Sequence, residues 1–98
     1  MIKWIVEDYE FQITVISLAP DNDPKRCRMG FEVGDVFTCK YECPAGFCPK
    51  SMGKLHALCD VVRAEGDLRL LGGDAVRSIR FTCADGPVLF RLEGNKIG

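Results

Sequence analysis

The chain carries almost no net charge. Thirteen lysine and arginine residues stand against fourteen aspartate and glutamate residues, which gives a formal charge of −1 over 98 residues. Proteins that bind nucleic acids or anionic lipid surfaces usually carry a strongly positive field. The composition therefore predicts no nucleic acid and no membrane among the partners of this protein.

Long apolar runs are also lacking. Glu7, Asp8 and Glu10 interrupt the first twenty residues, where a signal peptide needs an unbroken apolar segment, and no later stretch reaches the length that spans a bilayer. We therefore expect a cytoplasmic protein. The even number of cysteines, six, is the argument for the alternative, a secreted chain with three disulfides. Because an export signal is lacking, we expect the thiols to be reduced.

The composition is that of an ordinary globular protein. Hydrophobic residues make up 47% of the chain and charged residues 28%, a balance that differs from the highly charged compositions of disordered chains. A chain of this length has room for one hydrophobic core. We expect a single domain over residues 1–98.

Apolar residues alternate with polar ones in several segments, as in strands that bury one face. In three of these segments a phenylalanine, Phe37, Phe81 or Phe90, falls on the apolar face. A two-residue period at Ile2, Trp4 and Val6 suggests a further strand over 1–6. The main predicted strands lie near 11–18, 36–41, 77–83 and 88–93, and the last two form a hairpin around Ala84-Asp-Gly-Pro87.

One segment has the period of a helix. Met52, Leu55, Cys59 and Val62 recur at helical spacing, which predicts a helix over 51–65 that ends with Gly66 as the left-handed stop residue. Strands first and last with one helix between them indicate an α+β fold. We expect a small antiparallel or mixed sheet packed against one main helix.

The spacing of the cysteines excludes two common sites. No two cysteines are separated by two residues, so a thioredoxin-type motif and the usual zinc knuckle are absent. Cys43 and Cys48 have four residues between them, which is the outer limit of a zinc pair and the opening of a plant-type iron–sulfur spacing. That iron–sulfur spacing requires its next cysteine at position 51, which is Ser51.

The position of each thiol separates packing residues from candidates for chemistry. Cys39 and Cys59 fall on the apolar faces of a strand and of the helix, where a small core residue is the simplest interpretation. Cys48 lies just before the helix, where free backbone amides favour a thiolate. His56 stands three residues before Cys59, so a Cys–His pair is an alternative to a packed histidine.

A short basic segment offers one further candidate. Lys25, Arg26 and Arg28 follow a loop with two prolines. They could bind a phosphate or an acidic partner, although such charges are more often only solvated.

Four motifs in a fixed order resemble a family of prokaryotic proteins of about one hundred residues and unknown function. The motifs are a strand at 11–16, a Cys-x-x-Gly-x-x-x-Gly-x-x-Phe segment at 27–37, a Pro-x-Gly-x-Cys loop at 44–48 and a Cys-x-Asp-Gly hairpin from Cys83. The resemblance extends from Phe11 to Glu93. It departs from the family after the Cys loop, where family members often have an aromatic-rich segment with proline that residues 50–56 lack.

The resemblance supports the fold but carries no activity. It does place Cys27, Cys48 and Cys83 on motif positions, whereas the other three cysteines are particular to this chain. No catalytic or cofactor-binding residue is indicated. We expect a non-catalytic accessory or interaction module that binds a protein partner or a second copy of itself. The alternative is a soft-metal site, for zinc or an iron–sulfur centre, or a redox-thiol site built from these three cysteines.

Overall fold

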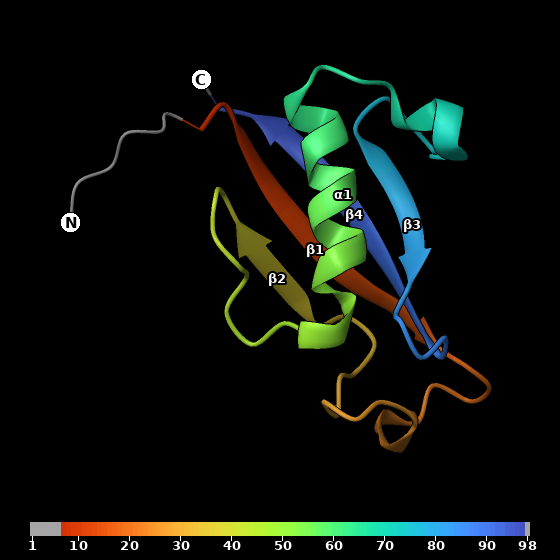
Figure 1. The fold of residues 1–98 in the computed structure, drawn as a ribbon. Coiled ribbons are helices and arrows are strands. Elements are labelled where there is room, and N and C mark those ends of the chain that lie inside the picture. Colours follow the sequence, from red (N-terminus) through yellow and green to blue (C-terminus); the bar gives the residue numbers. More distant parts are fainter. Residues whose placement is uncertain (1–6, 98) are drawn as a thin grey trace.

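Four strands form one antiparallel sheet in the computed structural model, which describes residues 7–97. They are β1 (Tyr9–Leu18), β2 (Val36–Cys39), β3 (Ser78–Thr82) and β4 (Val88–Lys96), in the order β2-β1-β4-β3. The helix α1 (Met52–Arg63) packs against one face of the sheet (Figure 1). The predicted α+β fold is confirmed, and the sheet is antiparallel throughout. The further strand predicted over 1–6 lies outside the described residues.

The alternation in the sequence matches the burial of the strands. Phe11, Ile13 and Val15 of β1 are buried, whereas Gln12 and Thr14 between them remain partly exposed. A bulge interrupts the pairing of β1 with β4 after Val15. The Val15 amide donates to the carbonyl oxygen of Asp35 at 2.8 Å, and the Val15 carbonyl accepts from the amide of Gly34 at 2.9 Å. These bonds tie the end of the loop 19–35 to β1.

The helix begins and ends close to the predicted positions. A 3₁₀ turn (Pro49–Ser51) leads directly into α1, and Leu55, Cys59 and Val62 face the sheet. At the other end Glu65, with a φ of 61°, takes the left-handed conformation that the sequence assigned to Gly66. The next residue, Gly66, has no room for a side chain, because a Cβ at this position would lie 2.7 Å from the side chain of Val61. The amide of Gly66 donates to the Val61 carbonyl at 2.8 Å and closes the helix.

Aromatic side chains fill the core at the end of the sheet where the helix begins. The ring of Phe90 lies 5.1 Å from that of Phe47, 5.2 Å from that of Phe81 and 6.2 Å from that of Phe31, measured between centroids. Phe37 is partly buried and packs on Phe31 at 4.9 Å. The predicted inward placement of the strand phenylalanines is therefore confirmed.

Two segments differ from the sequence-based expectation. Strand β2 stops at Cys39, so Tyr41 does not continue its buried face, and its exposed ring covers the guanidinium of Arg63 at 4.9 Å. The three glycines and two aspartates of the stretch 66–75 predict a loop, whereas the structure has the 3₁₀ helix Leu68–Leu71 there, of which only Leu68 is buried. Between residues 7 and 97, no helix is long and apolar enough to cross a membrane.

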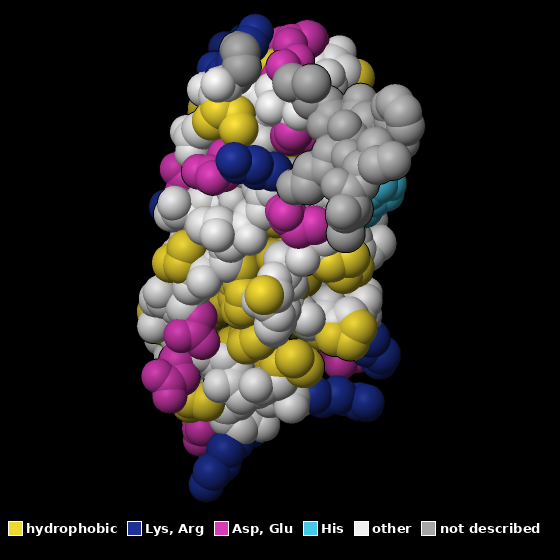
Figure 2. Space-filling model, turned by 90° about the vertical axis from the view of Figure 1, so that its left-hand side faces the viewer, with side chains coloured by type: hydrophobic (Ala, Val, Ile, Leu, Met, Phe, Trp, Pro, Cys, Tyr) yellow, Lys and Arg dark blue, Asp and Glu magenta, His cyan; other side chains and the backbone are white. Residues whose placement is uncertain are grey.

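The side of the molecule on which β2 lies shows apolar side chains gathered in the middle of its surface (Figure 2). Basic side chains project at its lower end, which is the end where the loop between β1 and β2 lies in Figure 1. That end of the sheet carries the candidate site.

Candidate functional site

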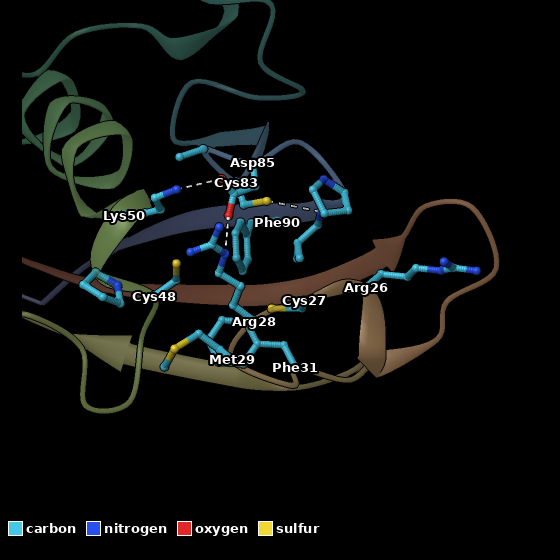
Figure 3. Close-up of a pocket in the computed structure, with 14 residues that line it drawn as sticks. Arg26, Cys27, Arg28, Met29, Phe31, Cys48, Lys50, Cys83, Asp85 and Phe90 are labelled. Atoms are coloured by element: carbon cyan, nitrogen blue, oxygen red, sulfur yellow. Dashed lines mark hydrogen bonds and ion pairs between the residues drawn. The ribbon is translucent and has the colours of Figure 1, made fainter.

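A pocket of about 210 Å³ opens at the end of the sheet where α1 begins. Three segments that are distant in the sequence form its walls (Figure 3). They are the loop 26–31, the entrance to the helix at 48–50, and the β3–β4 hairpin at 83–90.

The floor of the pocket is apolar and belongs to the core. Phe31, Phe90, Val88 and Cys83 line it, and each is buried. The walls add Met29 and two prolines, one from the helix entrance and one from the hairpin. A buried, largely hydrocarbon surface of this kind gains free energy when an apolar group replaces the water within it.

Hydrogen bonds of Ser51 and Lys54 hold the start of the helix against the hairpin. The hydroxyl of Ser51, which is fully buried, accepts from the amide of Ala84 at 3.3 Å. The ammonium group of Lys54 donates to the carbonyl oxygen of Thr82 at 3.1 Å. Because a buried hydroxyl without a partner is costly, the contact of Ser51 fixes this corner of the pocket.

The loop wall has its own local supports. The carboxylate of Asp23 accepts from the amide of Lys25 and caps the 3₁₀ turn Pro24–Arg26. The guanidinium of Arg26 binds both carboxylate oxygens of Asp21, at 3.2 and 3.0 Å. The carbonyl of Cys27 then accepts from the amide of Gly30, whose φ of 72° turns the chain back toward the sheet.

Charged side chains stand at the rim of the pocket. The carboxylate of Asp85 lies 2.9 Å from the ammonium of Lys50 and 3.7 Å from the guanidinium of Arg28. Lys50 and Arg28 reach it from the helix entrance and from the loop (Figure 3). The hydrogen bond from Lys50, reinforced by the charges of Lys50 and Arg28, holds the pKa of the Asp85 carboxyl below its usual value. Asp85 is therefore ionised at neutral pH.

The three cysteines on the resemblance motifs line this one pocket. Cys27 and Cys48 are partly buried, whereas Cys83 is buried and its sulfur accepts from the amide of Val88 at 3.4 Å. Over residues 7–97, however, no three histidine, cysteine, aspartate or glutamate side chains are placed to hold one metal ion. The metal site predicted at Cys27, Cys48 and Cys83 stays a prediction from the sequence motifs.

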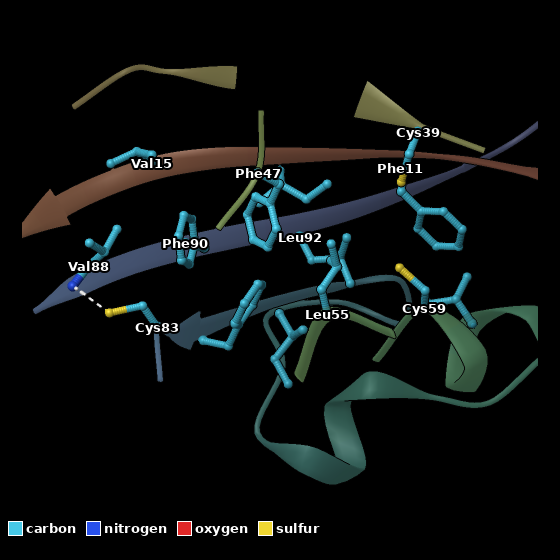
Figure 4. Packing of buried hydrophobic residues seen from close by; sticks show 14 of the residues in the cluster. Phe11, Val15, Cys39, Phe47, Leu55, Cys59, Cys83, Val88, Phe90 and Leu92 are labelled. Atoms are coloured by element: carbon cyan, nitrogen blue, oxygen red, sulfur yellow. Dashed lines mark hydrogen bonds between the residues drawn. The ribbon is translucent and has the colours of Figure 1, made fainter. Parts of the chain in front are cut away.

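The other cysteines lie elsewhere. Cys39 and Cys59 are 6% and 3% exposed and meet beside Phe11, at the end of the core opposite Cys83 (Figure 4). Burial raises the pKa of the Cys39 thiol to about 11 and that of Cys59 to about 12. Both behave as packing residues, as the sequence predicts. Cys43 is exposed and does not line the pocket.

Two further candidates from the sequence have definite positions. The side chain of His56 is 64% exposed and binds Asp60 at 3.2 Å, so it does not share a surface with the buried Cys59. From the basic segment, Arg26 and Arg28 line the pocket and Lys25 does not.

The sequence alone did not indicate that Lys50 and Asp85 are partners at the rim. Asp85 does fall on the Cys-x-Asp-Gly motif, which was the available signal. No feature of the chain near Lys50 indicates that it reaches across 35 residues to this carboxylate.

Comparison with protein-family models, with curated proteins and with solved structures gives no match. The resemblance to the family of small prokaryotic proteins stays a prediction from the motifs.

Proposed function

We propose that this protein is a non-catalytic interaction module whose pocket receives one apolar side chain of a partner protein. The observation that carries the proposal is the pocket itself: an apolar recess at the end of the sheet, with charged groups confined to its rim. Protein interfaces are commonly anchored by an apolar or aromatic residue that fills such a recess, surrounded by polar contacts.

The size of the pocket favours a single side chain over a larger molecule. Pockets for drug-sized ligands and cofactors have volumes of roughly 300–1,000 Å³, which exceeds the 210 Å³ found here. A cavity of about 150 Å³ lined by aliphatic and aromatic residues takes up benzene. The pocket therefore suits a group of the size of a leucine or phenylalanine side chain.

Selection from a random peptide library displayed on phage tests this proposal without a known partner. The full chain is the target, and the Ala84→Phe variant is the counter-target. Ala84 is exposed and lines the pocket, so an added ring covers the opening without entering the core. Ala84→Ser is the matched control, since it changes the same position but adds little volume.

The expected result is a set of peptides that share one leucine, methionine or aromatic position. These peptides bind the wild type and Ala84→Ser alike and lose at least about tenfold in affinity with Ala84→Phe. Circular dichroism and a thermal melt confirm that each variant is folded. Peptides that bind all three proteins equally, or a selection that yields no binder above background, would refute the proposal.

The placement of the motif cysteines favours a second candidate function. Cys27, Cys48 and Cys83 come from three separate segments and line the same pocket, and thiolates select soft metals such as zinc, copper(I) or the iron of iron–sulfur centres. Metal analysis of protein purified without chelator tests this candidate. About one equivalent of metal in the wild type and in Cys43→Ser, lost in Cys27→Ser/Cys48→Ser, would support it. A folded wild type without stoichiometric metal would reject it.

A further inference from the structure

The rim of the pocket holds two cations that share one carboxylate. Asp85 binds Lys50 at 2.9 Å and Arg28 at 3.7 Å. The third cation of the rim, Arg26, is already bound by both oxygens of Asp21. Arg28 and Lys50 together with Asp85 thus leave one positive charge in excess at the mouth of the pocket, in a protein whose formal charge is −1.

The contact of Arg28 is the weakest of the ion pairs at the rim. Its side chain is 79% exposed, and among residues 7–97 its only ion pair is the 3.7 Å contact with Asp85. At this distance the guanidinium does not form the two parallel hydrogen bonds that a carboxylate accepts from arginine at about 2.7–2.9 Å. Arg28 is therefore available to a better-placed acid without the loss of a strong internal contact.

We infer that the partner segment is acidic: an aspartate or glutamate next to its apolar anchor binds Arg28 and Lys50 and competes with Asp85 for them. This inference rests on the proposed function, because the anchor must occupy the pocket for the acid to reach the rim. Charge complementarity argues for it, since an acidic neighbour meets the excess positive charge and a basic neighbour would be repelled. In the unbound protein Asp85 stands in for the acid of the partner.

The peptides selected on the wild type provide the first test. Aspartate or glutamate should be enriched within two positions of the apolar anchor, and lysine and arginine depleted there. A synthetic peptide of this set and its Asp→Asn or Glu→Gln counterpart are compared by fluorescence polarisation. Because partly exposed ion pairs are modest, we expect the acid to strengthen binding about three- to tenfold at low salt. This advantage should decrease as salt screens the charges.

Variants of the rim residues provide the second test, and we expect them to change the affinity for the acidic peptide in opposite directions. Arg28→Gln should weaken binding of the acidic peptide about threefold and leave binding of the neutral peptide unchanged. Asp85→Asn removes the internal competitor, so it should strengthen the acidic peptide about two- to fivefold and leave the neutral peptide unchanged. These effects follow only if the acid of the peptide and Asp85 use the same cations.

Matched controls separate this effect from the total charge of the protein. Arg69→Gln removes a positive charge at the 3₁₀ helix 68–71, where Arg69 is paired with Asp67. Asp74→Asn removes a negative charge from the pair with Arg80. Neither residue lines the pocket, so both variants should bind the acidic peptide as the wild type does.

The outcomes distinguish this inference from the proposed function. If peptides blocked by Ala84→Phe show no acidic preference, or if Asp85→Asn weakens the acidic peptide, the inference is wrong and the apolar pocket remains. If no peptide depends on the pocket, both are wrong. If Arg69→Gln weakens the acidic peptide as much as Arg28→Gln, the preference reflects total charge, and the assigned site at the rim is wrong.

Discussion

The thiols should differ in their rates of alkylation, and for Cys39 and Cys59 the structure gives the size of the difference. Treatment of the folded protein with iodoacetamide near neutral pH is the perturbation. The reactive species is the thiolate, so the rate depends on the fraction ionised and on access to the sulfur. Cys39 and Cys59 are buried, and the pKa of each thiol is raised. Cys43 is exposed, and Cys27 and Cys48 are partly exposed.

The magnitude follows from the pKa values. A rise from the ordinary value of 9.0 to about 11 at Cys39 lowers the thiolate fraction near pH 7 about a hundredfold, and a rise to about 12 at Cys59 lowers it about a thousandfold. Burial slows attack further. Even if the protein were stable by only about 5 kcal/mol, global unfolding would expose these thiols in only about 10⁻⁴ of the molecules, so labelling through the unfolded state adds little.

The assay quantifies each labelled peptide by mass spectrometry against time, with the same protein in guanidinium chloride as the reference for every cysteine. Cys43 should approach its denatured rate, and Cys27 and Cys48 should follow. Cys39 and Cys59 should be at least a hundredfold slower than their own denatured rates. Labelling of Cys59 within about tenfold of its denatured rate, in protein shown to be folded, would refute the reasoning about the core.

Three further outcomes are expected. Phe81→Ala should lower the free energy of unfolding by about 3–5 kcal/mol in denaturant titrations, because the ring is buried 5.2 Å from that of Phe90; a loss under about 1 kcal/mol would contradict this packing. Between about pH 9 and 11, unfolded thiols ionise while the buried ones stay protonated, so stability should fall as pH rises, by at most about 1.4 kcal/mol per unit for each thiol. Cys59→Ala should show a shallower slope, and parallel slopes would count against a raised pKa at this site. Arg63→Lys should lower the stability measured in a thermal melt by about 1 kcal/mol. Arg63 stacks on Tyr41 and donates to the carbonyl of Lys40 at 2.8 Å, and lysine cannot make both contacts. An unchanged melting temperature would argue against that role.

The fold was predictable because burial imposes a simple period on its elements. One face of the sheet is covered, so Phe11, Ile13 and Val15 alternate with polar residues, and the single helix shows its buried face as a repeat of apolar positions. The residues at which the strands end were harder to predict from the sequence. Tyr41 continues the alternation of β2 in the sequence, but the strand ends at Cys39 and the ring of Tyr41 packs on the guanidinium of Arg63.

The candidate site was predictable only in part. The motifs singled out Cys27, Cys48 and Cys83, and all three line the pocket. The pocket itself is a product of three segments brought together by the sheet order, and local periodicity contains no information about which loops meet at one end. Local periodicity therefore could not predict the contact between Lys50 and Asp85. The same holds for the hydrogen bond between the buried Ser51 hydroxyl and the hairpin.

The sheet order also sets a condition on biosynthesis. Strand β1 pairs along most of its length with β4, from Tyr9 opposite Lys96 to Leu18 opposite Val88. Until β4 has left the ribosome, β1 can pair only with the four residues of β2, and a two-stranded hairpin of that size is marginal in water. The backbone groups along the β4 side of β1 would therefore stay unpaired during translation, and unpaired strand edges are prone to aggregate. Rapid closure of the sheet once β4 has emerged, or a chaperone that shields β1 before then, would limit this exposure.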